Sequence, residues 1–168
     1  MRGLGAIRGD MTTASDVNMM KFPIFLRKTF VERMISFPDG TQWNFEKVYA
    51  YRVVEWKGNR SDHVTINDFL SKAEVAGCKG LPRGISNDVW DNPLFYGVSL
   101  FKDVISLKNC FKFPRLTKRL AQGYVVDSGG PIYFKDNESH ITWWLFDGVE
   151  DVLSKNFVIT EDEETNNE

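Results

Sequence analysis

A short run of small residues around Ser128 is the part of the chain that most suggests catalysis. The run reads Asp127-Ser128-Gly129-Gly130-Pro131. Glycines let the backbone turn tightly, so that two N–H groups can face the oxyanion that forms beside a serine nucleophile. Such a serine also needs a base within hydrogen-bond reach. The only histidines available for that role are His63 and His140.

The run resembles the nucleophile loop of trypsin-like serine proteases. His63, Asp103 and Ser128 stand in the chain order of that family's catalytic residues, and Asp103 begins a segment similar to the family's aspartate segment. The resemblance implies peptide hydrolysis by these three residues. However, few residues separate Asp103 from Ser128, and the family's second barrel needs several strands there. We therefore favour a hairpin turn, which the same residue types also form.

Three other positions occur in an order that suggests NAD chemistry. Arg52 lies in Tyr-Ala-Tyr-Arg-Val-Val, Ser99 in Tyr-Gly-Val-Ser-Leu-Phe, and Glu150 precedes a late apolar segment. This layout resembles Arg-Ser-Glu-type ADP-ribosyltransferases. The resemblance implies that Arg52 binds a phosphate of NAD, that Ser99 holds the nicotinamide-ribose side, and that Glu150 orients the attacked ribose. The family's Ser-Thr-Ser triplet and Glu-x-Glu pair are absent, so this enzyme is the alternative hypothesis.

A basic strip and an isolated tryptophan are the candidate binding residues. No acid occurs between Val104 and Val126, whereas five bases do: Lys108, Lys112, Arg115, Lys118 and Arg119. A patch of this kind can contact an acidic protein or the phosphates of a nucleic acid. Trp90 stands in a polar loop, and tryptophan is enriched in binding hot spots. Both regions therefore enter the predicted contact surface.

The remaining polar and aromatic residues give fewer expectations. Two histidines exclude a multi-histidine metal site, and no cysteine or carboxylate stands at ligand spacing, so we expect no metal. We expect no cofactor either, except NAD under the alternative hypothesis. Adjacent Trp143 and Trp144 would point to opposite faces of a strand. One is expected in the core, and the other is a candidate exposed anchor.

A mixture of strands and helices must position these residues. Apolar alternation predicts strands over 45–56, 95–101, 140–146 and 156–160, and a hairpin over 124–127 and 132–135. The first strand is apolar on both sides, which is typical of a central strand. Helices are expected from the Thr65/Asp68 pair to Gly77, and from Asp103 to a point before Pro114, while 22–37 suits either a helix or a strand. The pattern predicts an α+β fold with a mostly antiparallel sheet, a strand-rich C-terminal third, and two to three helices packed on one face.

Length and composition are those of one globular domain. The chain has 168 residues, of which 42% are hydrophobic and 26% charged. We expect a flexible arm over 1–20, a domain over 21–160, and a disordered tail over 161–168, which holds five of the 23 acids. Two cysteines, no signal peptide and no membrane-spanning run favour a soluble, cytoplasmic protein. The working hypothesis is a small regulatory or accessory protein that binds a protein or another acidic partner.

Overall fold

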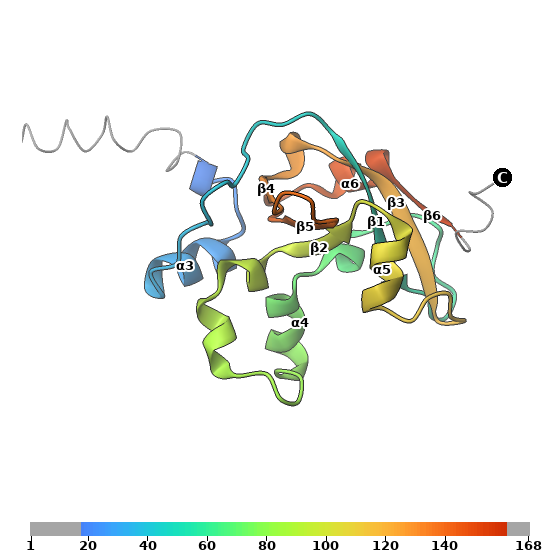
Figure 1. Ribbon diagram of the computed structural model, residues 1–168, viewed down its shortest axis with the longest axis horizontal. Helices are drawn as coiled ribbons and strands as arrows, with labels where there is room; N and C mark the ends of the chain where they lie inside the picture. Colours follow the sequence, from blue (N-terminus) through green and yellow to red (C-terminus); the bar gives the residue numbers. More distant parts are fainter. Residues whose placement is uncertain (1–17, 161–168) are drawn as a thin grey trace, which may run out of the picture.

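The fold is a six-stranded antiparallel sheet with helices on both of its faces (Figure 1). The computed structural model describes residues 18–160. The strand order is β4-β5-β2-β1-β3-β6. This arrangement confirms the predicted α+β class and the mostly antiparallel sheet. The predicted N-terminal arm, apart from its last three residues, and the acidic tail lie outside the described residues.

Most of the predicted elements occur, in shorter form. The strands are β1 (Val48–Glu55), β2 (Val98–Phe101), β3 (Lys118–Val125), β4 (Ile132–Tyr133), β5 (His140–Trp143) and β6 (Phe157–Thr160). The helices are α3 (Ile24–Glu32), α4 (Lys72–Lys79), α5 (Val104–Cys110) and α6 (Glu150–Asn156). Short 3₁₀ turns are η1 (Ile66–Phe69), η2 (Asn87–Asp91), η3 (Pro93–Tyr96) and η4 (Asp127–Gly129).

Strand β1 is central, as its two apolar faces predict. It pairs with β2 on one side and with β3 on the other. Ala50 and Val54 pack on the side of helix α6, whereas Tyr51 and Val53 pack on the opposite side with helix α5. Because both faces of β1 are apolar, helices must cover both. Figure 1 shows α4 and α5 on one side of β2 and α6 on the other.

Trp143 and Trp144 anchor two different apolar clusters. Trp143 packs with the strands and Leu153 of α6, and Trp144 packs with Phe30 of α3 and Ala76 of α4. Both tryptophans are completely buried. The expectation of opposite faces is confirmed, but the idea that one indole is an exposed anchor is wrong, because helices α3 and α4 cover it.

The predicted hairpin around Ser128 does not exist. Strand β3 pairs with β1 and β6, whereas β4 pairs with β5 at the far edge of the sheet. The glycines between them serve close packing instead. A Cβ atom on Gly129 would lie 2.6 Å from the Trp143 ring, and one on Gly130 would lie 1.9 Å from the Trp144 carbonyl oxygen.

The helix predicted from Thr65 to Gly77 is two separate elements. Thr65 and Asp68 do form a capping box, but it caps only η1. The chain is extended at Leu70, and Ser71 with Glu74 then forms a second capping box that begins α4. Helix α4 continues past Gly77 to Lys79. The break matters because it places the carbonyl groups of residues 68 and 70 beside the sheet.

A glycine pair tests the packing explanation for the Ser128 run. We expect Gly130→Ala to lower the free energy of unfolding by about 3 kcal/mol or more, because its φ is +135° and its Cβ would collide with the backbone of Trp144. Urea denaturation measures this loss. Gly77→Ala, in the middle of α4 with nothing within 4 Å, is the matched control and should stabilise by about 0.5 kcal/mol. Equal stabilities of the two variants would contradict the explanation.

Candidate functional site

A large pocket lies on the face of the sheet that carries α4 and α5. Its volume is about 590 Å³. Helix α4, the segment 80–95, the strands β2 and β5, and Phe111 at the end of α5 line it. Most of the lining is apolar, and three of its side chains are 40–46% exposed: Val75, Ile85 and Phe111. A pocket of this size with a mainly apolar wall is typical of a ligand site.

A serine and a histidine from neighbouring strands meet in the wall of this pocket. Ser99 on β2 pairs with Thr142 on β5, and Phe101 pairs with His140. Ser99 and His140 are therefore diagonal neighbours on one face of the sheet, within reach of a long side chain. Ser99 Oγ lies 3.0 Å from His140 Nε2. The Phe101 ring packs edge-on against the imidazole with 5.2 Å between ring centroids.

The surroundings of His140 favour its neutral form. Burial lowers the pKa of His140 below its usual value, the nearby Lys72 ammonium lowers it further, and Glu138 opposes both effects. A neutral imidazole has one nitrogen free to accept a proton. At neutral pH His140 Nε2 can therefore accept a hydrogen bond from the Ser99 hydroxyl.

Arg52 anchors the backbone of Ser99 through a hydrogen bond to its carbonyl oxygen. Its guanidinium donates to three carbonyl oxygens: Nη1 to Ser99 at 2.7 Å, Nε to Asp68 at 2.8 Å and Nη2 to Leu70 at 3.1 Å. Burial lowers the pKa of Arg52 to about 10, although Asp68 and Glu74 raise it in part. Arg52 thus stays charged at neutral pH, and its N–H groups donate largely to backbone carbonyls.

The charge of the pocket is one-sided. Arg52 and Lys72 line it, and no aspartate or glutamate is among the described residues of its wall. Lys72 begins α4 and is exposed at the pocket. Because no carboxylate of the described residues lies in the wall itself, the exposed Lys72 ammonium gives the pocket a local positive charge that favours an anionic or electron-rich group.

The comparisons with known proteins assign no function to this site. No family model, curated protein or solved structure matches the chain. The physical properties of the pocket are therefore the basis for a function.

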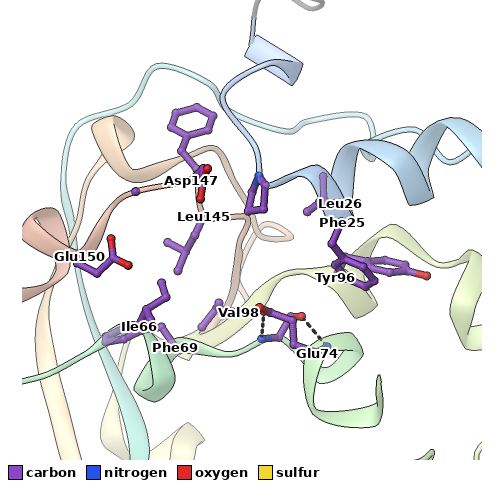
Figure 2. A pocket seen from close by; sticks show the side chains of 14 residues that line it. Phe25, Leu26, Ile66, Phe69, Glu74, Tyr96, Val98, Leu145, Asp147 and Glu150 are labelled. Carbon is purple, nitrogen blue, oxygen red and sulfur yellow. Dashed lines mark hydrogen bonds between the residues drawn. The ribbon is translucent and has the colours of Figure 1, made fainter. Parts of the chain in front are cut away.

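Of the three residues proposed for NAD chemistry, the structure brings two together. Arg52 and Ser99 share the large pocket. Glu150 instead lines a second pocket of about 250 Å³, where Figure 2 shows it with Asp147 and Glu74 around an apolar floor that includes Phe69. The Arg52 donors face backbone carbonyls. This geometry does not favour the ADP-ribosyltransferase arrangement.

The residues of the protease hypothesis lie on three different segments. His63 precedes η1, Asp103 caps α5 by accepting from the Ser106 N–H at 2.7 Å, and exposed Ser128 lies in η4. The Asp103 carboxylate accepts hydrogen bonds from the backbone N–H and the hydroxyl of Ser106, and the Asp103 backbone N–H donates to the Ser139 hydroxyl oxygen. The arrangement of a serine beside a histidine occurs in this protein at Ser99, and not at Ser128.

Trp90 packs against its own domain. Its ring meets Phe95 edge-on with 5.1 Å between centroids, and its carbonyl oxygen accepts a 2.6 Å hydrogen bond from the Tyr96 hydroxyl. The indole is partly buried against the cluster that contains Trp144. Trp90 therefore belongs chiefly to the fold, although part of its surface faces solvent.

The basic strip does not form one helical face. Helix α5 ends at Cys110, and strand β3 begins at Lys118. Lys118 is paired with Glu55, and the Arg119 guanidinium lies 5.0 Å from the Trp56 ring. The other three bases are exposed: Lys108, Lys112 and Arg115.

Metal and membrane sites find no support within residues 18–160. No three His, Cys, Asp or Glu side chains there form a group that could hold a metal ion. No helix of this described region is long and apolar enough to cross a membrane.

The contact between Ser99 and His140 was not predicted from the sequence, although both residues lie on predicted strands. Each residue occurs in an apolar strand pattern, which shows only that the two can face a sheet surface. Their contact depends on β2 and β5 being neighbours in one particular register. Neither property can be read from the local pattern of one strand.

Replacing Arg52 tests its role in holding the pocket wall. We expect Arg52→Met to lower the free energy of unfolding by about 3–5 kcal/mol, because three carbonyl groups lose a charged donor. Thermal and urea denaturation measure the effect. The control is Arg33→Met, which removes an exposed 3.0 Å ion pair with Asp91 and should cost less than about 1 kcal/mol. A comparable loss in both variants would show that Arg52 is an ordinary surface arginine.

The pKa of His140 can be measured directly. A ¹H NMR titration of the ring protons, assigned with His140→Gln, should give a midpoint below the usual histidine value of about 6.5. Because the folded state then binds the proton less tightly than the unfolded chain, this group makes the protein less stable as the pH falls below about 6.5. A midpoint at or above that value would show that His140 is hydrated or paired with an anion.

Proposed function

We propose that the protein is a binding protein whose ligand has an extended apolar body and an anionic end. The pocket of about 590 Å³ carries the proposal, because it joins an apolar wall to two cations and no described acid. Val75, Ile85 and Phe111 keep large parts of their surfaces in water. Covering these surfaces with an apolar ligand would contribute free energy in proportion to the area buried.

The position of Lys72 supports an anionic end group. Its ammonium lies at the pocket and acts electrostatically on His140. Ser99 and His140 add polar atoms on the sheet side of the same pocket. A carboxylate placed among these groups would meet positive charge and hydrogen-bond donors while its hydrocarbon chain lay against α4. Medium-chain alkyl carboxylates are the simplest molecules with this chemistry.

A second candidate is an acidic protein partner that binds the loop 111–117. Leu116 in this loop is 91% exposed, and Lys112 and Arg115 are exposed near it. An exposed apolar side chain among bases could bind an acidic partner, because it offers apolar contact together with complementary charge. This candidate retains part of the basic strip as the contact and does not require the pocket.

A series of alkyl carboxylates tests the pocket. By titration calorimetry, affinity should rise about fourfold for each added CH₂ until the pocket is filled, which corresponds to about 0.8 kcal/mol per group. Octanoate should bind more tightly than octylamine, because only the carboxylate is attracted to Lys72. Val75→Glu should lower the affinity for octanoate at least tenfold, since it adds a negative charge to the pocket wall.

Two controls separate the candidates. Val31→Glu makes the same change at an α3 position that is 74% exposed and outside the pocket, so it should leave octanoate binding unchanged. The double variant Lys112→Glu/Arg115→Glu lies outside the pocket wall and should also bind octanoate normally. A preference for octylamine, or equal loss in Val31→Glu and Val75→Glu, would refute the pocket proposal. Loss of octanoate binding only in the double variant would place octanoate at the loop 111–117 and would also refute the pocket proposal.

A further inference from the structure

The Ser99–His140 pair has the geometry of a nucleophile with its base. Ser99 Oγ and His140 Nε2 are 3.0 Å apart, a distance within the range found for such pairs. Both side chains line the large pocket and are only partly buried, so a bound molecule can reach them. Neither lies on a loop. Strands β2 and β5 hold them in register, and Arg52 fixes the Ser99 carbonyl.

We propose that Ser99 is an acyl-accepting nucleophile and that the pocket hydrolyses esters of apolar carboxylic acids. In the first half-reaction Ser99 Oγ attacks the ester carbonyl carbon, while its proton passes to His140 Nε2. The Oγ–acyl bond forms and the bond from the acyl carbon to the alkoxy oxygen breaks. The leaving oxygen takes the proton from His140, so that an alcohol departs and an acyl-serine remains.

Water completes the reaction in the second half. His140 Nε2 takes one proton from water as its oxygen attacks the acyl carbon. The bond between Ser99 Oγ and the acyl carbon breaks, and Oγ recovers its proton from His140. The carboxylic acid is released and no oxidant or reductant is involved. In both halves the Lys72 ammonium, which lines the same pocket and acts electrostatically on His140, would attract the negative charge that develops on the carbonyl oxygen.

The substrate class follows from the same pocket and therefore depends on the proposed function. The acyl chain would lie against the apolar side chains of α4 and the segment 80–95, which the carboxylate product would also occupy. No acid stands among the described residues of the wall, and none hydrogen-bonds to His140. Activated esters are thus the best probe, because their good leaving groups reduce the demand on the base.

The test uses p-nitrophenyl hexanoate and an alkyl fluorophosphonate on the full chain. Hydrolysis should begin with a burst of about one p-nitrophenolate per protein, and intact-mass and peptide analysis should place the phosphonate on Ser99. Ser99→Ala should lower kcat/KM at least 100-fold and abolish labelling. His140→Gln should lower kcat/KM similarly and should remove the acidic limb of the pH profile of kcat/KM. A merely structural histidine would not produce the second change.

Ser128→Ala is the matched control. Ser128 is exposed in η4, outside the pocket, and its removal should leave hydrolysis and labelling unchanged. The proposal is overturned if Ser99→Ala hydrolyses the ester at the original rate, if the label lies on another residue, or if the wild-type protein shows no hydrolysis above buffer. Circular dichroism melting of each variant separates loss of activity from loss of fold.

Binding and hydrolysis fail in distinguishable ways. If octanoate binds to the wild-type protein and to Ser99→Ala but no ester is hydrolysed, the nucleophile is refuted and the binding function stands. If no alkyl carboxylate binds, the proposed ligand class fails, and so does the substrate class deduced from it. Rapid labelling of Ser99 without carboxylate binding would keep the nucleophile and reject the apolar anion.

Discussion

Three hydrogen bonds from the Arg52 guanidinium join the central strand β1 to β2 and to the segment that leads into α4. Strands β1 and β2 are paired at one position, where Tyr51 lies opposite Phe101. Beyond it, Arg52 donates to the carbonyl of Ser99 on β2 and to two carbonyls of the segment that leads into α4. Buried backbone carbonyls need donors, and a rigid planar cation can satisfy several at once. Arg52 thus joins β1, β2 and the segment before α4, all of which contribute residues to the pocket wall.

The paired tryptophans explain how a small sheet supports two layers of helices. Trp143 and Trp144 bury their rings in different apolar clusters, and Gly129 and Gly130 admit the chain close to them. A side chain at either glycine would collide with the ring of Trp143 or the backbone of Trp144. The two glycines of the run that resembles a nucleophile loop are therefore explained by packing.

The large pocket and the Ser99–His140 pair are consequences of one arrangement. On the face opposite α6, α4 and α5 pack in separate clusters, so that the sheet between them lies open to the pocket. Ser99 and His140 are the polar residues of β2 and β5 in its wall. Their diagonal contact joins residues that are 41 positions apart in the chain. A binding function and an acyl-transfer function would thus share the same atoms and depend on the same strand pairing.

Features whose causes act within a few residues could be predicted from the sequence. The Asp103 cap begins α5, the Thr65/Asp68 capping box is local, and the apolar alternation of 45–56 marks a central strand. The neighbours of each strand, the position of Glu150 relative to Arg52 and the contact of His140 with Ser99 became known only from the folded molecule. The physical reason is that strand order and register are selected by the burial of whole faces, to which residues far apart in the chain contribute together.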